Sequence, residues 1–263
     1  MLVDKETLFQ RLAESELTVV DARSSSEFAA GHIPRAINLP ADLLQDPDSA
    51  RGALLPVEVL AARLGSRGIG NHGPLVLCDD SGLVPSARLF WLLESLGRGE
   101  AALLDGGFSA WRNAGLPLES GGSEPRPAEF QPRPTDGVYA RRTQVQQAIG
   151  RSDISIVDAR SAEEYQGRSS TAARDGHIPG AVNIDWQQHI LDLFDPTFRP
   201  QDQLESLYRQ HGVTRDKQVI AYCRSGARSS HTYFVLRLLG YSRVSNYVGS
   251  WLEWGNDPAL PIE

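Results

Sequence analysis

The sequence predicts an α/β fold built from two tandem domains, each a mostly parallel sheet flanked by helices. Two observations carry this prediction: the chain repeats itself, and short apolar runs alternate with helical patterns in each copy. Residues 19–39 (VVDARSSSEFAAGHIPRAINL) return as residues 156–184 (IVDARSAEEYQGRSSTAARDGHIPGAVNI), with extra residues within Gln166–Asp175. Further blocks recur in the same order, so the chain is a tandem duplication: 74–82 with 218–226, 86–97 with 229–240, and 106–111 with 249–254.

The apolar runs are short and continuous, which is typical of strands buried on both faces of a parallel sheet. They are Leu17–Asp21, Leu75–Cys78, Ile154–Asp158 and Val219–Tyr222. Helical spacing follows in each copy, and a glycine (Gly97, Gly240) stands where a helix should end. The expected helices are Ser24–Ala30, Pro56–Leu64, Ser86–Leu96, Gln203–His211 and Ser229–Leu239.

Composition separates the two copies. Residues 121–137 are rich in proline and glycine and lack apolar periodicity, which indicates an extended linker. The expected domains are therefore residues 1–120 and 138–263, each close to the commonest domain size.

The net charge of -7 argues against a nucleic-acid partner, because such binding rests on a basic surface. No run reaches the roughly eighteen apolar residues of a membrane helix, and the start lacks the pattern of a signal peptide. We therefore expect a cytoplasmic protein without a membrane partner. There a disulfide between Cys78 and Cys223 is not expected. Neither cysteine has a companion at metal-ligand spacing, so no metal is expected.

Cys223 follows an expected strand and directly precedes an expected helix. Functional groups of open α/β sheets collect at such strand ends. The loop offers backbone N–H groups, the positive end of the helix, two arginines and a glycine that permits a tight turn. These features would stabilise a thiolate, the reactive form of cysteine. We predict Cys223 as the catalytic nucleophile, inside an anion-binding cradle formed by Arg224, Ser225, Gly226, Ala227, Arg228 and Ser229.

The first copy argues for the same interpretation. A lone cysteine is more often a small buried hydrophobic residue than a nucleophile. In the first copy, however, Asp79 and Asp80 occupy the places of Cys223 and Arg224, and two carboxylates would repel an anion. We expect the first domain to be catalytically inactive, with Cys78 packed on its strand.

The tandem halves, the "DARS…GHIPGAVN" segment, the cysteine loop and the "GSWLEW" ending resemble the two-domain rhodaneses, the thiosulfate and 3-mercaptopyruvate sulfurtransferases. The resemblance covers nearly the whole chain. It implies that Cys223 takes a sulfane sulfur from a donor, holds it as a persulfide and passes it to cyanide, a thiol or a sulfur-acceptor protein. It also implies that this covalent persulfide replaces any cofactor. We expect a monomer, because a tandem pair buries its own interface.

The cations of the CRSGAR loop favour thiosulfate as the donor. The alternative is 3-mercaptopyruvate, because relatives that use it hold the substrate carboxylate with arginines of the corresponding insertion, where this chain has Arg168 and Arg174. A cysteine-loop phosphatase is disfavoured, because that class needs Cys-x5-Arg and this loop is Cys-x4-Arg. A non-enzymatic sulfur carrier or regulatory module is disfavoured by the retained cysteine.

Some residues recur in both copies and are therefore expected to be structural. The pairs Asp21/Arg23 and Asp158/Arg160 should fix a strand end, with Glu27 or Glu164 as a further partner of the arginine. His32 and His177 should cap a turn. Three residues of the second copy are further candidates for the pocket: Arg174, Trp251 and His231.

Overall fold

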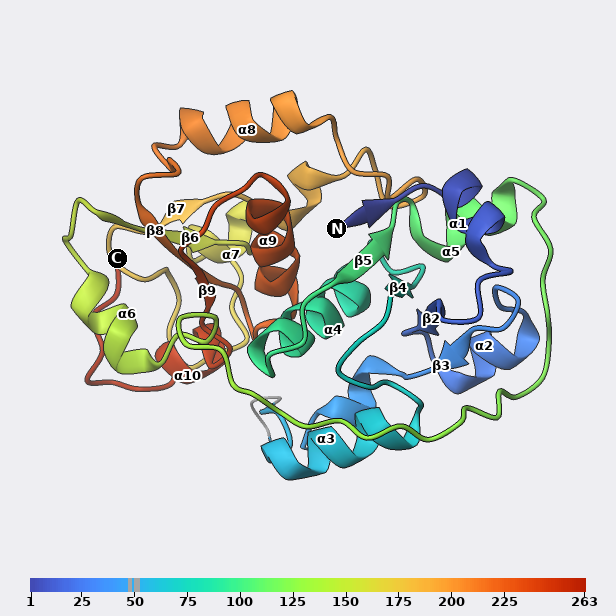
Figure 1. Ribbon diagram of the computed structural model, residues 1–263. Helices are drawn as coiled ribbons and strands as arrows, with labels where there is room; N and C mark the ends of the chain where they lie inside the picture. Colours follow the sequence, from blue (N-terminus) through green and yellow to red (C-terminus); the bar gives the residue numbers. More distant parts are fainter. Residues whose placement is uncertain (47–48, 50–52) are drawn as a thin grey trace. The chain divides into compact units, whose positions relative to one another are not determined.

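The computed structural model describes residues 1–46, 49 and 53–263, which form two compact units (Figure 1). The first unit contains Met1–Ser49, Leu54–Thr135 and Ile190–Phe198. The second contains Asp136–His189 and Arg199–Glu263. Each unit has its own parallel sheet and its own core, as the repeat predicts.

The sheet of the first unit has the strand order β1-β5-β4-β2-β3, and every neighbouring pair is parallel. Its strands are β1 (Leu2–Val3), β2 (Thr18–Asp21), β3 (Ile37–Asn38), β4 (Leu75–Cys78) and β5 (Ala101–Leu104). Its helices are α1 (Lys5–Arg11), α2 (Ser25–Ala30), η1 (Ala41–Leu44), α3 (Val57–Ser66), α4 (Val84–Ser95) and α5 (Gly107–Asn113).

The sheet of the second unit has the order β7-β6-β8-β9, again parallel throughout. Its strands are β6 (Ile154–Asp158), β7 (Val182–Asn183), β8 (Gln218–Tyr222) and β9 (Val244–Asn246). Its helices are α6 (Arg142–Ala148), α7 (Ala162–Tyr165), η2 (Trp186–His189), α8 (Gln201–Gln210), α9 (Ala227–Leu238) and α10 (Ser250–Trp254). The predicted fold class is confirmed, and the expected strands and helices lie within two residues of the observed ones.

The strand registers of the two units correspond at the central strands. Asp21 pairs with Cys78 in the first sheet as Asp158 pairs with Tyr222 in the second. Asp79 therefore occupies the place of Cys223, one residue beyond the strand. This register supports the alignment of the two copies drawn from the sequence.

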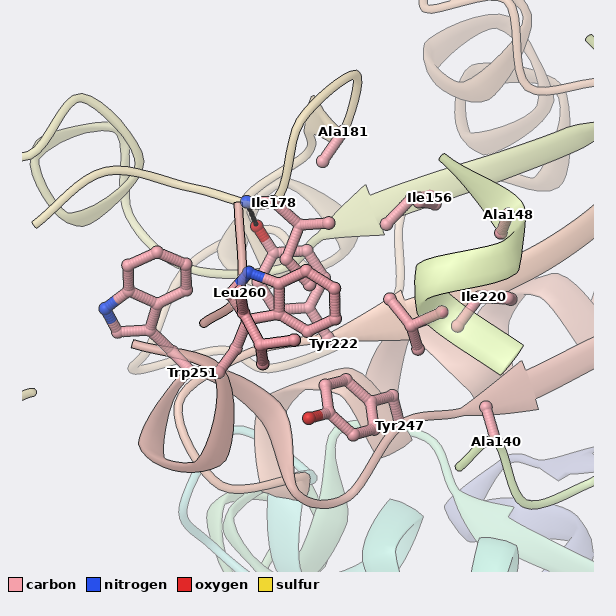
Figure 2. Packing of buried hydrophobic residues seen from close by; sticks show 12 residues of the cluster. Ala140, Ala148, Ile156, Ile178, Ala181, Ile220, Tyr222, Tyr247, Trp251 and Leu260 are labelled. Carbon is pink, nitrogen blue, oxygen red and sulfur yellow. Dashed lines mark hydrogen bonds between the residues drawn. The ribbon is translucent and has the colours of Figure 1, made fainter. Parts of the chain in front are cut away.

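The hydrophobic core of the second unit includes residues of α10 and of the C-terminal segment that follows it. Figure 2 shows part of this cluster, in which Tyr222 lies against Ile178 and its hydroxyl accepts a hydrogen bond from the Ile178 N–H (3.2 Å). Trp251 and Trp254, from α10, are 1% and 0% exposed and belong to the same cluster. A fully buried aromatic residue stabilises a core by about 2–3 kcal/mol, so this cluster holds α10 firmly against the sheet.

The expected linker contains no helix or strand, but part of it is bound to the first unit. The N–H of Ala128 donates to Gly65 O (2.9 Å), and that of Arg133 donates to Leu96 O (2.8 Å). Phe130 between them is 6% exposed. The segment is thus held against α3 and α4 up to Thr135.

Residues Ile190–Phe198, from the second half of the sequence, belong to the first unit. The N–H of Phe198 donates to the carboxylate of Asp105 at 2.9 Å, and Ile190 pairs with Phe198 in an antiparallel bridge. This contact could not be predicted from the sequence, because Asp105 lies about ninety positions before Phe198 in the chain. Among the described residues, no helix is long and apolar enough to cross a bilayer.

Candidate active site

The turn between β8 and α9 brings Cys223 to the carboxyl end of the sheet. Gly226 precedes the helix with a φ of +87°, in the left-handed region that favours glycine. A Cβ at Gly226 would lie 2.9 Å from Cα of Val248, closer than real Cβ atoms approach backbone. Only glycine fits this position without displacing the chain that follows β9.

Hydrogen-bond donors of the loop point at the cysteine sulfur. The N–H of Gly226 donates to Cys223 Sγ at 3.2 Å, and the Ser229 hydroxyl lies 3.5 Å from the same atom. Burial acts to raise the pKa of the Cys223 thiol, since the residue is only 1% exposed. The charge of Arg228 and hydrogen bonds from Ser229 and Ser225 outweigh burial, and the net effect places this pKa below the ordinary 9.0.

The two loop arginines have different surroundings. Arg228 is part-buried and makes a two-pronged ion pair with Glu164, with Nη1–Oε2 at 2.6 Å and Nη2–Oε1 at 2.9 Å. Arg224 is exposed, and its Nε donates to the Thr171 hydroxyl at 2.8 Å. Arg228 therefore carries most of the electrostatic effect on the sulfur, whereas Arg224 is tied to the insertion. The sequence analysis placed Glu164 beside Arg160, and the observed hydrogen bonds of its carboxylate to an arginine go to Arg228 instead.

Asn246, at the end of β9, holds the cysteine loop with three hydrogen bonds. Its amide nitrogen donates to Gly226 O (3.0 Å) and to the Ser230 hydroxyl (2.8 Å). Its amide oxygen accepts from the Ser229 hydroxyl at 2.7 Å. That hydroxyl has one proton, so it donates either to Asn246 or to Cys223 Sγ.

The sequence analysis missed Asn246, although a comparison of the copies contains the signal. Leu77 pairs with Leu103 in the first sheet as Ala221 pairs with Asn246 in the second. A buried leucine thus stands in the first copy where a buried amide stands beside the cysteine loop of the second.

Ser250 is a second residue that the sequence analysis missed. Its hydroxyl accepts a hydrogen bond from the Cys223 N–H (3.1 Å) and donates to Tyr247 O (2.7 Å). Ser250 has a φ of +51°, and its counterpart Gly107 has +60°. A residue other than glycine costs about 1–3 kcal/mol in a sparsely populated backbone region. In the second unit this backbone strain lies at Ser250, whose hydroxyl accepts a hydrogen bond from the backbone N–H of Cys223.

Arg174 lies outside the cysteine loop, and its place at the pocket stays a prediction. Its guanidinium donates to backbone carbonyls of the last turn of the chain, at Leu260 (2.9 Å), Trp254 (3.0 Å) and Gly255 (3.3 Å), and also to that of Asp257. A cation at these carbonyls offsets the negative end of α10. The contacts therefore give Arg174 a structural role.

Trp251 and His231 are interior residues, and their place at the pocket stays a prediction. The ring of Trp251 lies on the guanidinium of Arg160 (4.4 Å), and the backbone N–H of Trp251 donates to Cys223 O at 3.0 Å. His231 is fully buried, and its Nδ1 lies 3.2 Å from Nδ1 of His189. Burial and the neighbouring imidazole lower the pKa of His231 well below 6.5, so it is neutral. The comparison of copies also finds the counterpart of Trp251: Phe108 donates its N–H to Asp79 O and stacks on Arg23 (3.4 Å).

The residues that recur in both copies have structural roles, as expected. Asp21 and Arg23 form a buried ion pair of 2.5 Å, and Asp158 and Arg160 form one of 2.6 Å. The histidines bond to backbone carbonyls of the preceding helices α2 and α7, with His32 Nδ1 2.8 Å from Phe28 O and His177 Nδ1 2.9 Å from Tyr165 O.

The corresponding loop of the first unit binds its own carboxylate. Asp79 is fully buried, and its side chain accepts from the N–H groups of Ser81 (2.7 Å) and Ser86 (2.9 Å). Its loop amides thus point at an anion that belongs to the chain. Cys78 is fully buried in the core, and burial together with nearby carboxylates raises the pKa of its thiol well above 9.0.

The two loops therefore differ in chemistry although both follow a strand end at the same register of their sheets. The loop of Cys223 favours a thiolate and offers N–H and O–H donors to negative charge on sulfur. Such an arrangement suits nucleophilic attack on an electrophilic sulfur and stabilisation of the anion that forms.

Comparison with known proteins agrees with this geometry. The Rhodanese-like domain family matches the chain twice, at residues 4–114 and 142–257. The chain belongs to the rhodanese family. The predicted family is confirmed, and so is the predicted enzyme class: the protein is a sulfurtransferase of this family.

Two relatives extend over the whole of this rhodanese. A thiosulfate sulfurtransferase of Azotobacter vinelandii is 35% identical, over 100% of this chain and 97% of that one. A thiosulfate sulfurtransferase of Pseudomonas aeruginosa is 34% identical with the same coverage. Among solved structures, SseA from Escherichia coli, described as a 3-mercaptopyruvate sulfotransferase with the rhodanese fold, matches with a TM-score of 0.86. It is 27% identical and covers 95% of this chain and 98% of its own.

Proposed function

We propose that this rhodanese is a thiosulfate sulfurtransferase that works through a persulfide on Cys223. The observation that carries the proposal is the loop of Cys223, where a nearby guanidinium and loop donors lower the pKa of a thiol at a strand end. The full-length relatives named as thiosulfate sulfurtransferases support the choice of donor.

The proposed reaction has two displacements. The Cys223 thiolate attacks the outer sulfur of thiosulfate, the S–S bond of the donor breaks, and sulfite leaves with the bonding pair. Cyanide or another thiophilic acceptor then attacks the terminal sulfur of the persulfide, and the thiolate returns. Negative charge stays on sulfur in both steps, where the N–H of Gly226 and the hydroxyl of Ser229 stabilise it. Neither step needs a metal or an organic cofactor.

The alternative donor is 3-mercaptopyruvate, which the structural similarity to SseA favours. The chemistry at Cys223 would be the same, with pyruvate as the leaving product. Arg174 is not well placed to hold the carboxylate of this donor, because its guanidinium is bound to the backbone carbonyls of Leu260 and Trp254. Arg224, held at the insertion by Thr171, is the better placed cation for that role.

We expect the enzyme to act in the cytoplasm, because Cys78 and Cys223 are both free thiols and thiols persist in reducing compartments. We also expect a monomer. A thiol or a sulfur-acceptor protein would be the acceptor there, and cyanide serves as the acceptor in the assay.

The test compares the two donors side by side. Thiocyanate formation from cyanide is measured with thiosulfate and with 3-mercaptopyruvate, and the intact mass of the protein is measured after each donor alone. We expect a gain of one sulfur atom with thiosulfate and a higher kcat/KM with it. A preference for mercaptopyruvate would replace the donor and keep the persulfide, whereas no added sulfur with either donor would refute the proposal.

A further inference from the structure

The ion pair between Arg228 and Glu164 joins the cysteine loop to a helix far from it in sequence. The two side chains are 23% and 18% exposed, and both prongs of the guanidinium point at the carboxylate. Burial acts to raise the pKa of Glu164, but the hydrogen bonds and charge of Arg228 lower it below its ordinary value. Glu164 is therefore ionised at neutral pH. Its carboxylate already occupies the two guanidinium N–H groups of Arg228 that could otherwise bind an oxyanion.

Glu164 also has a second task, which its counterpart shares. It closes the capping box of α7 with Ser161, as Glu27 closes that of α2 with Ser24. In the first copy the residues that correspond to Ala227 and Arg228 fall within Leu83, Val84 and Pro85, which carry no charge. The capping box thus accounts for a glutamate in both copies, and the contact with a loop arginine belongs to the second copy.

Other charges surround this pair. Asp158 is paired with Arg160, and Asp185 is half-buried with a pKa raised by burial and by Glu164 and Glu163. Arg228 is the cation that most favours the Cys223 thiolate. With Glu164 ionised beside it, an incoming anion meets a nearly neutral pair in place of a free cation.

We propose that Glu164 is a specificity-determining residue, whose carboxylate neutralises Arg228 and thereby restrains the binding of multiply charged sulfur donors. The inference rests on the proposed function, because it concerns the donor that reaches Cys223. Glu164 acts through Arg228 and is a positioning residue. Its removal should strengthen binding of a dianion more than binding of a monoanion, because the Coulomb energy scales with donor charge.

The first test uses Glu164→Gln with Glu27→Gln as the matched control. Glutamine is accepted in a capping box, so both variants should keep their helix ends. We expect Glu164→Gln to lower the KM for thiosulfate about tenfold at low salt, the size of a screened interaction between a unit charge and a dianion. The KM for mercaptopyruvate should fall about threefold, since its charge is half as large. The kcat for each donor should stay within about twofold, and Glu27→Gln should match the wild type.

A second test works without sulfur transfer. Cys223 is alkylated with iodoacetate, an anion, and with neutral iodoacetamide, and mass spectrometry assigns the modified cysteine. The ratio of the two rates reports the potential at the sulfur. Glu164→Gln should raise this ratio about threefold and Arg228→Gln should lower it, while Glu27→Gln leaves it unchanged.

These tests separate the inference from the proposed function. If the wild type transfers no sulfur but the alkylation ratio changes as expected, the donor assignment fails and the role of Glu164 stands. An unchanged or lower ratio in Glu164→Gln, or a KM for thiosulfate that rises, would overturn the inference. That result would mean that Glu164 serves only to hold Arg228 in place.

Discussion

The loop that follows β4 is one residue longer than the loop that follows β8, and the two loops differ in chemistry. Both contain a glycine in the left-handed region, Gly82 with a φ of +70° and Gly226 with +87°. In the first loop the amides bind the buried carboxylate of Asp79, which completes the loop from within the chain. In the second loop the central residue is Cys223, so the donors face a sulfur atom that can change its bonding. The fold supplies the loop, and we expect the central residue and the charges around it together to decide whether the loop is structural or reactive.

The differences extend to the residues around the loops. Where the first unit has Leu103 and Gly107, the second has Asn246 and Ser250, and each adds hydrogen bonds to the backbone or side chains of the cysteine loop. A buried amide stabilises a structure only when its partners are in place. The second unit therefore fixes its loop with a polar network that the first unit does without.

The largest test of this comparison exchanges the two buried cysteines for alanine in turn. Cys223→Ala should reduce cyanide-dependent transfer at least about a thousandfold, because it removes the nucleophile. Cys78→Ala removes only core volume, so it should keep kcat within about twofold while it lowers the free energy of unfolding by about 1 kcal/mol. Thiocyanate assays and urea denaturation measure the two effects. An inactive Cys78→Ala of normal stability would contradict the assignment of the nucleophile.

A medium-sized effect is expected from exchanging the residues at the paired positions 103 and 246. Asn246→Leu removes three hydrogen bonds and leaves buried polar groups of the loop with fewer partners, so it should lower the stability by about 2–4 kcal/mol. It should also reduce kcat about tenfold, because the donors at Cys223 lose their support. The reciprocal Leu103→Asn buries an amide in an apolar site and should destabilise by about 2–4 kcal/mol with unchanged kcat. Urea denaturation and steady-state kinetics distinguish the outcomes. Full activity in Asn246→Leu would show that the network is dispensable.

The sequence was sufficient for the features that depend on local pattern. The repeat, the period of the apolar runs and the glycine before α9 predict the two sheets and the place of Cys223, because each of these signals can be read from the order of the residues without knowing which side chains meet in the fold. The partners of the loop come from elsewhere: Glu164 lies 64 positions from Arg228. Pairing over such a separation depends on the packed fold. Arg174 shows the same limit, since a long side chain reached the carbonyls near the chain end in place of the loop.

The smallest expected change is the most direct test of what the second loop adds. Asp79→Cys, made together with Cys223→Ala, places a thiol at the same point of the first loop. No arginine corresponds to Arg228 there, and Asp21 and Asp80 are close enough to raise the pKa of the adjacent Cys78. We therefore expect no transfer above that of Cys223→Ala alone.

The pH dependence of alkylation by iodoacetamide shows whether charge is the reason. Thiolate forms as the pH rises through the pKa, so Cys223 of the wild type should react with a midpoint below 9.0. The thiol introduced by Asp79→Cys should need a higher pH, because burial and neighbouring carboxylates disfavour its ionised form. If it reacted as readily as Cys223, or restored transfer, then the loop backbone alone would activate a cysteine. The inactivity that we expect of the first unit would then come from a single residue, and the charges around Arg228 would tune the reaction without being required for it.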